Sequence, residues 1–184
     1  MNNLNKTYGL YIHIPFCKSK CYYCDFYSEK YENSLLEKYI DALSKEILNF
    51  NKKLNFPTIS TLYVGGGTPS LLKEKQIIRL FSIIKKNFET KFLEEINIEL
   101  NPESVSENKI KVLKEIVLTE FTKADLRLSL GVQSFNNEIL KNIGRIHTSK
   151  HIYNAVEIFN KLNITNFNFD LIFGFPKQTV EDVE

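Results

Sequence analysis

The sequence predicts an α/β protein in which parallel strands alternate with helices. Short β-branched and aromatic runs alternate along the chain with longer segments that carry apolar residues at helical spacing. Most of the strand-like runs end in a glycine, a proline or a polar residue before the next helix begins. Parallel strands need crossover connections, and helices supply them, so this alternation favours one parallel sheet with right-handed crossovers. The pattern alone leaves open whether the sheet is doubly wound or part of a barrel.

The elements are expected in a regular order. Strands are expected at 8–14, 58–64, 96–100, 126–132 and 166–173. Helices are expected at 34–51, 77–88, 104–116, 136–143 and 149–162, with one more beginning at Thr179. Ser34 with Glu37 three residues later forms a capping-box pattern at the start of the first helix. Its apolar face is then Leu36, Ile40, Leu43 and Ile47.

The composition excludes several classes of protein. The chain has 184 residues, of which 43% are hydrophobic and 25% charged, as in one soluble globular domain. Its net charge of +2 comes from interspersed charges, which argues against a nucleic-acid partner. No apolar run reaches membrane-spanning length, and the N-terminus lacks the layout of a signal peptide. We therefore expect a cytoplasmic protein without a transmembrane segment.

All three cysteines lie in one short stretch, at Cys17, Cys21 and Cys24, with the spacing C-x3-C-x2-C. An odd number cannot pair off into disulfides within the chain, and clustered thiols suit a reducing compartment. Thiolates select zinc, copper(I) or iron–sulfur clusters. A structural zinc site has four protein ligands, whereas three leave one position open for a substrate. The spacing favours a three-thiolate cluster; zinc with His13 as fourth ligand and three unrelated reduced cysteines are the alternatives.

Polar residues share one face of several predicted strands, although strands of a helix-covered parallel sheet are usually apolar on both faces. Ligands of parallel α/β folds lie at the carboxyl ends of the strands. The pattern therefore predicts a polar, ligand-holding interior, the alternative being scattered surface polar residues on edge strands. The polar sets are Tyr11 with His13, Asn97 with Glu99, Ser129 with Gly131 and Gln133, and Asn168 with Asp170.

The cysteine stretch resembles the cluster loop of radical S-adenosylmethionine (SAM) enzymes, with the aromatic Tyr23 directly before the third cysteine. The segment YIHIPFC, which begins at Tyr11, is similar to the oxygen-independent coproporphyrinogen oxidase-like family, which contains a porphyrinogen dehydrogenase and a haem chaperone. The resemblance implies a partial, incomplete β/α barrel. It also implies that the three cysteines hold a [4Fe–4S] cluster whose fourth iron binds SAM. One electron would then cleave SAM to methionine and a 5′-deoxyadenosyl radical.

Further motifs match the family in the same order. The GGGTP stretch at 65–69 is not a Walker phosphate loop, and it resembles the motif that grips the amino-acid end of SAM. Other matches lie in IELNPE, LGVQSF, IGRIH and FDLIFGFP. Some of the matching residues, with Tyr23, Gly67 and Thr68, line a second SAM site in the porphyrinogen dehydrogenase. The residues implied to bind cofactor are Tyr11, Tyr23, Gly66, Gly67, Thr68, Glu99, Gln133, Arg145 and Asp170.

Phe26, two residues after Cys24, distinguishes the two branches of the family. The dehydrogenase branch carries a cysteine there and the haem-chaperone branch an aromatic residue, so the resemblance favours the chaperone branch. It implies radical SAM machinery without coproporphyrinogen oxidase activity. The partners it implies are SAM, haem or porphyrin, an electron donor and a haem-acceptor protein. Coproporphyrinogen III oxidation and a zinc-binding structural module are the alternative functions.

The histidines assign no haem ligand. His13 is expected in the sheet interior, and His147 and His151 are expected at the surface near helix ends. The sequence also departs from the family in two places. The segment 117–124 is expected to form an enlarged loop, and family members continue for about another domain's length beyond Glu184. Residues 1–184 are therefore expected to be a radical SAM core truncated at its C-terminal side, without the C-terminal domain of the family.

Overall fold

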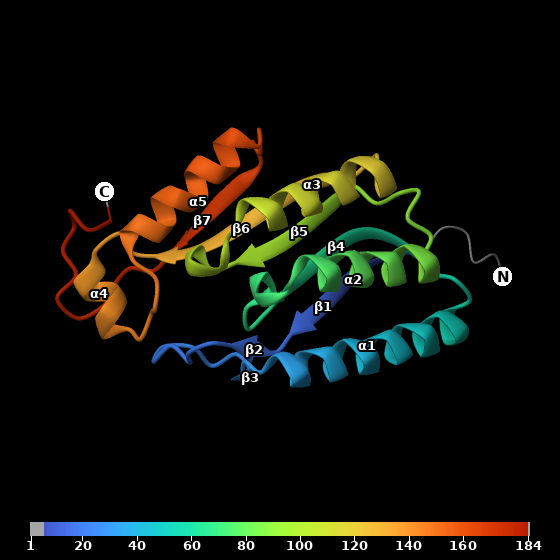
Figure 1. The fold of residues 1–184 in the computed structure, drawn as a ribbon, viewed down its shortest axis with the longest axis horizontal. Helices are drawn as coiled ribbons and strands as arrows, with labels where there is room; N and C mark the ends of the chain where they lie inside the picture. Colours follow the sequence, from blue (N-terminus) through green and yellow to red (C-terminus); the bar gives the residue numbers. More distant parts are fainter. Residues whose placement is uncertain (1–5, 184) are drawn as a thin grey trace.

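A five-stranded parallel sheet forms the centre of the computed structural model, which describes residues 6–183 (Figure 1). The strand order is β1-β4-β5-β6-β7, so each crossover adds the next strand on the same side of the last. This confirms the predicted parallel strand–helix alternation. A short parallel pair, β2 (Phe16–Cys17) with β3 (Glu29–Lys30), follows the first strand. The main strands are β1 (Thr7–Ile14), β4 (Thr58–Gly66), β5 (Glu95–Leu100), β6 (Asp125–Gln133) and β7 (Phe167–Leu171).

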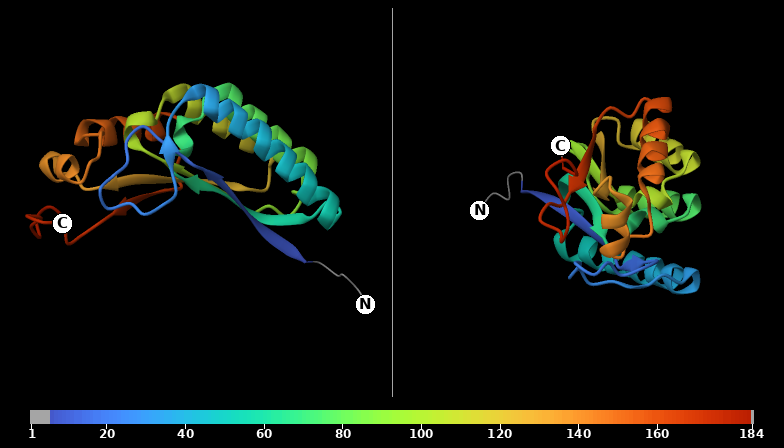
Figure 2. Two further views of the ribbon diagram at one scale, coloured as in Figure 1. Left: turned by 90° about the horizontal axis from the view of Figure 1, so that it is seen from below. Right: turned by 90° about the vertical axis from the view of Figure 1, so that its left-hand side faces the viewer.

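The long helices all lie on one face of the sheet and leave the other face uncovered by helices (Figure 2). The short helix α4 lies instead at the end of the sheet where the strands finish (Figure 1). Two 3-10 turns, η1 (Pro69–Leu71) and η2 (Pro102–Ser104), follow β4 and β5. The helices are α1 (Asn33–Leu54), α2 (Glu74–Asn87), α3 (Glu107–Glu120), α4 (Asn137–Asn142) and α5 (Ser149–Lys161).

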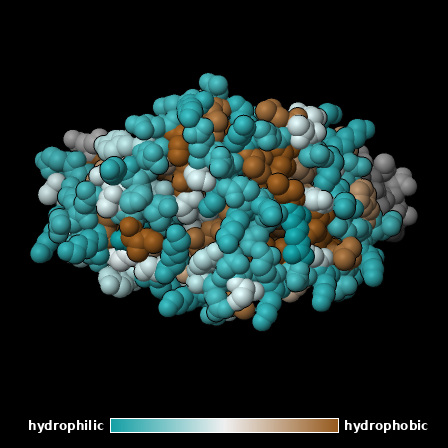
Figure 3. All heavy atoms as spheres, viewed as in Figure 1, coloured by the Kyte–Doolittle hydropathy of each residue, from teal (hydrophilic) through white to brown (hydrophobic). Residues whose placement is uncertain are grey.

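The core lies between the sheet and these helices. The four apolar residues predicted for the first helix, Leu36, Ile40, Leu43 and Ile47, are all buried. They pack in one cluster with the apolar strand residues, which include Ile12, Ile98 and Leu130. Burial of one such side chain stabilises a fold by about 1.5–3 kcal/mol. The exposed surface over the helices is mainly hydrophilic, with apolar side chains in patches between them (Figure 3).

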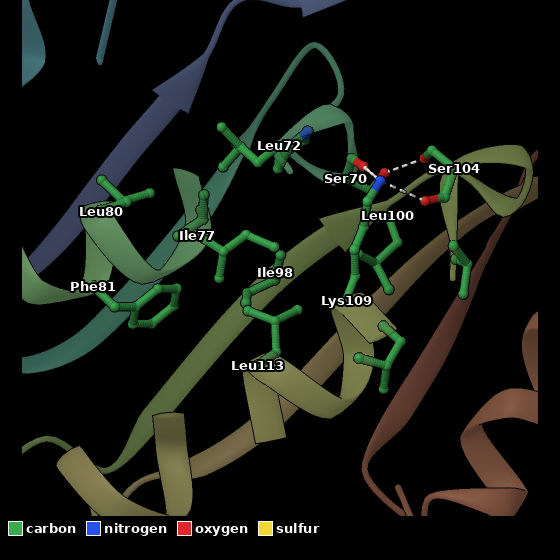
Figure 4. A pocket seen from close by; sticks show the side chains of 14 residues that line it. Ser70, Leu72, Ile77, Leu80, Phe81, Ile98, Leu100, Ser104, Lys109 and Leu113 are labelled. Atoms are coloured by element: carbon green, nitrogen blue, oxygen red, sulfur yellow. Dashed lines mark hydrogen bonds between the residues drawn. The ribbon is translucent and has the colours of Figure 1, made fainter. Parts of the chain in front are cut away.

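Lys109 of α3 ties the two 3-10 turns together on the helix-covered face of the sheet (Figure 4). Its Nζ donates hydrogen bonds to the carbonyl oxygens of Ser70, at 2.7 Å, and Ser104, at 3.1 Å, and the hydroxyls of the two serines bond to each other. Burial lowers the pKa of Lys109. The adjoining cavity is about 20 Å³, with apolar walls that include Ile77 and Leu113, which makes it a packing defect and not a ligand site.

Three sequence-based expectations about the elements differ from what the structure describes. The segment 117–124 is not an enlarged loop, because α3 continues to Glu120 and leaves a short turn that the buried Phe121 anchors. The strand expected at 166–173 ends at Leu171. From Thr179 to Val183 the described chain forms turns, and the Asp182 carboxylate accepts from the Thr179 amide at 2.9 Å and from Asn136 at 2.8 Å.

Within residues 6–183 no helix is long and apolar enough to cross a membrane.

Candidate cofactor site at the carboxyl ends of the strands

The cysteine loop, residues 17–24, lies at the carboxyl end of β1, beside α4 (Figures 1 and 2). The β2–β3 pair closes its base, where the Tyr31 amide donates to the Cys17 carbonyl at 2.8 Å. At its far side the Tyr22 amide donates to the carbonyl of Ile143, just after α4, at 3.0 Å. Backbone hydrogen bonds therefore hold the loop at its base and at its far side. The loop lies at the end of the sheet where the strands finish.

The three thiols are each half-buried and have different neighbours. Thr68 donates its hydroxyl to Cys17 Sγ at 3.5 Å, and Arg145 donates Nη1 to Cys21 Sγ at 3.7 Å. Cys24 faces the hollow described below. Nowhere in the described chain do three His, Cys, Asp or Glu side chains converge as ligands of one ion. A cubane cluster does not require such convergence, because each cysteinate binds a different iron.

His13 does not join the thiols as a fourth ligand. Its Nε2 lies 3.1 Å from the Tyr27 carbonyl oxygen, which only accepts, so Nε2 carries the proton. Its Nδ1 then accepts from the Tyr11 hydroxyl at 2.8 Å. Both ring nitrogens have partners, which removes the support for the zinc alternative. His13 projects from the open face of β1, half-exposed, and Tyr11 at the sheet edge is 55% exposed.

The glycines at 65–67 bring the backbone of β4 against the cysteine loop. A Cβ on Gly67 would lie 2.8 Å from the Phe16 carbonyl oxygen and 3.0 Å from Cys17 Sγ. Gly66 has a φ of +114°, and a Cβ there would lie 2.8 Å from the His13 ring. Only glycine fits these positions without displacing the loop. The predicted cradle is thus built directly beside the first thiol.

Glu99 on β5 is fixed from two sides. The Tyr63 hydroxyl donates to its Oε1 at 2.6 Å, and the Gly66 amide donates to its Oε2 at 3.0 Å. Burial, together with the bond to Glu99, raises the pKa of Tyr63, so its phenol stays protonated as a donor. Burial and the charge of Glu99 also raise the pKa of Tyr11. Tyr63 is not among the predicted site residues, although the two-residue period of β4 places it on the same face as Gly65.

Arg145 reaches the site from the loop after α4. Its Nη2 donates to the Gly131 carbonyl at 2.5 Å and to Asn101 Oδ1 at 3.1 Å, while Nε donates to His147 Nδ1 at 3.2 Å. The expectation of a surface His147 is wrong: it is 2% exposed, and its Nε2 donates to the Val132 carbonyl at 3.0 Å. Its polar partners, supplied by other elements, allow a histidine to be buried there.

A hollow of about 290 Å³ opens at the carboxyl ends of β4, β5 and β6, near the lower end of the range for small-ligand sites. Burial raises the pKa of Tyr23 at its wall to about 12, and burial raises the pKa of Asp170 against the opposing charge of Arg127. Seven predicted cofactor residues line the hollow together with Cys24 and Phe26: Tyr23, Gly66, Gly67, Glu99, Gln133, Arg145 and Asp170.

Two predicted cofactor residues do not line this hollow. Tyr11 stands at the free edge of β1, with its hydroxyl on His13. Thr68 is buried and places its hydroxyl between Cys17 and Asn101. Sequence reasoning also missed Asn101, which lies in the hollow's wall at the end of β5. Thiols, a glycine cradle and a polar hollow side by side fit a [4Fe–4S] cluster with an adjoining SAM molecule.

Comparison with known proteins places these features in a family. The family described as the Radical SAM superfamily matches residues 11–184. Two haem chaperones named HemW are similar: the protein of Lactococcus lactis is 40% identical over 98% of this chain, and that of Bacillus subtilis 37% over 95%. The chain spans 45% and 44% of their respective lengths.

A solved structure gives the same result for the fold. Coproporphyrinogen III oxidase (HemN) of Escherichia coli, described as a radical SAM enzyme, superposes with a TM-score of 0.81 and 33% identity. The match covers 95% of this chain and 39% of that protein. The fold is thus the predicted partial β/α barrel of radical SAM type. The chain belongs to the radical SAM superfamily.

Proposed function

We propose that Cys17, Cys21 and Cys24 hold a [4Fe–4S] cluster, that SAM binds in the adjoining hollow, and that the chain acts within a haem chaperone. The observation that carries the proposal is the packing of Gly67 against Cys17 Sγ, because it joins the thiols to the hollow without an intervening side chain. When bound, the cluster would supply the electron that reductively cleaves SAM. The protein's own part is to bind, orient and shield.

The residues of the hollow divide this work between them. Backbone amides of the glycine stretch can donate to the carboxylate of an amino acid, and Glu99 and Asp170 can accept from its ammonium group. The hydrogen bond from the Tyr63 hydroxyl to Oε1 fixes the orientation of Glu99. Gln133 lies at the end of β6 with a φ of +67°, and it lines the hollow. The family resemblance implies SAM contacts for the glycine stretch, Glu99, Gln133 and Asp170, and the structure adds the bond from Tyr63.

Two observations support haem binding and transfer. The similar proteins at 37–40% identity are named haem chaperones, and the aromatic Phe26 stands where the chaperone branch has one. Phe26 is 67% exposed beside the hollow, so an apolar, planar ligand could stack on it. The partners in this proposal are haem or porphyrin, an electron donor and a haem-acceptor protein. Coproporphyrinogen III oxidation is the second candidate, which the likeness to HemN favours.

Anaerobic reconstitution with iron and sulfide tests the cluster. We expect about four irons per chain with visible charge-transfer absorption, and loss of both in Cys21→Ala. Uptake of zinc without that absorption, or full iron content in Cys21→Ala, would contradict the cluster. Calorimetric titration with SAM, with and without the cluster, then tests the hollow.

Haem titration separates the two candidate functions. We expect a Soret band that saturates with added haem and no decarboxylation of coproporphyrinogen under reducing conditions. Turnover of coproporphyrinogen would instead favour the second candidate. Phe26→Cys, which introduces the residue of the dehydrogenase branch, should weaken the haem signal and leave the iron content unchanged.

A further inference from the structure

A buried polar chain runs from Glu103 through His147 and Arg145 to Cys21. His147 is 2% exposed, and the Glu103 side chain is 9% exposed. Glu103 Oε2 lies 3.6 Å from His147 Nδ1. Arg145 then connects the histidine to the cysteine loop, with Nε at 3.2 Å from Nδ1 and Nη1 at 3.7 Å from Cys21 Sγ. The members come from η2, from the loop after α4 and from the cysteine loop, so the fold assembles them.

The hydrogen bonds fix the tautomer of His147. The Val132 carbonyl oxygen only accepts, so the proton of the ring is on Nε2. The guanidinium of Arg145 only donates, so Nδ1 must be the acceptor. A neutral ring with a free lone pair on Nδ1 is therefore built to receive Arg145, and its orientation fixes where the guanidinium lies.

Glu103 acts on Arg145 through its negative charge. Among the described residues, its buried Oε2 has no hydrogen-bond donor. A buried carboxylate without a donor is costly unless an opposite charge lies near, and Arg145 supplies that charge. Asn101 Oδ1 and the Gly131 carbonyl oxygen both accept hydrogen bonds from Nη2 of Arg145. Nη1 remains, and it points to Cys21 Sγ.

We propose that His147 and Glu103 are positioning residues that hold the Arg145 guanidinium against Cys21 Sγ and thereby raise the reduction potential of the cluster. The inference rests on the proposed cluster. A donor and a positive charge at a cysteinate sulfur favour the reduced cluster, which carries one more negative charge. Arg145 would thus make reduction of the cluster more favourable, a role separate from contact with SAM.

Two substitutions at one position isolate the contact. In His147→Gln the amide nitrogen reaches the position of Nε2 and still donates to Val132, but nothing accepts from Arg145. In His147→Asn the amide oxygen stands near the position of Nδ1 and still accepts from Arg145, while the bond to Val132 is lost. Both variants lose one buried hydrogen bond, so a purely structural role would affect them alike.

The measurement is a redox titration of the reconstituted cluster without SAM, followed by electron paramagnetic resonance, with iron and sulfide content determined on each sample. We expect His147→Gln to lower the reduction equilibrium constant about threefold and His147→Asn to keep it. Arg145→Gln should lower it about tenfold, which corresponds to about 59 mV for one electron.

The outcomes separate this inference from the proposed function. Failure of the wild-type chain to take up iron and sulfide would overturn both. A wild-type cluster, with Arg145→Gln at the wild-type potential, would overturn this inference and leave the proposed cluster standing. Equal potentials in the two His147 variants would overturn the positioning role of His147. If the His147 variants do not fold, Glu103→Gln replaces them, and unchanged potential there together with unchanged potential in Arg145→Gln overturns the proposal.

Discussion

The Tyr63 hydroxyl donates a 2.6 Å hydrogen bond to Glu99 Oε1 across the β4–β5 pair. The bond fixes a carboxylate that the Gly66 amide contacts on its other oxygen. Strand register produces it, because Tyr63 pairs with Asn97, two residues before Glu99. A residue outside the family motifs thus determines how the carboxylate of the IELNPE motif faces the hollow.

Tyr63→Phe should remove this bond and leave the strand intact. We expect the free energy of unfolding to fall by about 1.5–3 kcal/mol, the usual contribution of a hydrogen bond to a charged group. SAM affinity of the reconstituted protein should fall as well, because Glu99 loses its fixed orientation. Urea unfolding and calorimetric titration measure the two effects. Tyr153→Phe is the control, since Tyr153 is 60% exposed on α5, and an equal loss in both variants would contradict the role of Tyr63.

Gly67→Ala should impair cluster uptake. The added Cβ would lie 2.8 Å from the Phe16 carbonyl oxygen, so the cysteine loop must move. We expect the iron content after reconstitution to fall to less than half of the wild-type value. Gly9→Ala provides the matched control, because its Cβ would meet only the Thr61 side-chain oxygen, at 3.1 Å. Normal iron content in Gly67→Ala would show that the glycine cradle is not required.

Lys109→Met should loosen the two turns that follow β4 and β5. The substitution keeps the aliphatic stem and removes the ammonium group from the Ser70 and Ser104 carbonyls. We expect a loss of about 1.5–3 kcal/mol in the free energy of unfolding. Lys111→Met, on the exposed side of α3, should stay within about 0.5 kcal/mol of the wild type. Similar urea midpoints for both variants would rule out the tie between the turns.

The ionisation of Glu103 should make the free energy of unfolding depend on pH. Burial alone raises the pKa of this carboxyl, but a backbone hydrogen bond and the positive charge of Arg145 more than offset it, and the pKa lies below its ordinary value of 4.5. The unfolded chain therefore takes up this proton first as pH falls. The ionised group stabilises the fold above about pH 4.5, and this contribution is lost as pH falls through the folded pKa.

The measurement compares urea unfolding of the wild type and Glu103→Gln at pH 7 and at successive values below pH 4.5. We expect the variant to be less stable at pH 7 by about 1–3 kcal/mol, and the difference to shrink as the solution becomes more acidic. Glu115→Gln, exposed on α3, serves as the control. A difference that stays constant across this range would refute the contribution of Glu103.

Local patterns predicted the parts of the fold that depend on neighbouring residues along the chain. The spacing of Leu36, Ile40, Leu43 and Ile47 predicted the buried face of α1, and the alternation around Glu99 predicted the polar face of β5. The contacts of Tyr63 and His147 depend instead on partners 36 and 15 residues away, which only register and packing bring together. The segment 117–124 was misjudged because helix and loop differ there by the burial of Phe121, a tertiary contact.

The placement of the long helices on one face of the sheet affects which substitutions the strands can accept. Each strand gives one set of alternate positions to the helices and the other set to the uncovered face. On that face Ser129 bonds to Asn97 and Asn168, so the polar residues of neighbouring strands contact each other and not the core. Asn97 and Ser129 are nevertheless buried, so a substitution that breaks these bonds costs stability even where Ile98 and Leu130 keep their packing. A change of ligand preference on this face is therefore expected to need paired polar exchanges, which keep each buried donor matched to an acceptor.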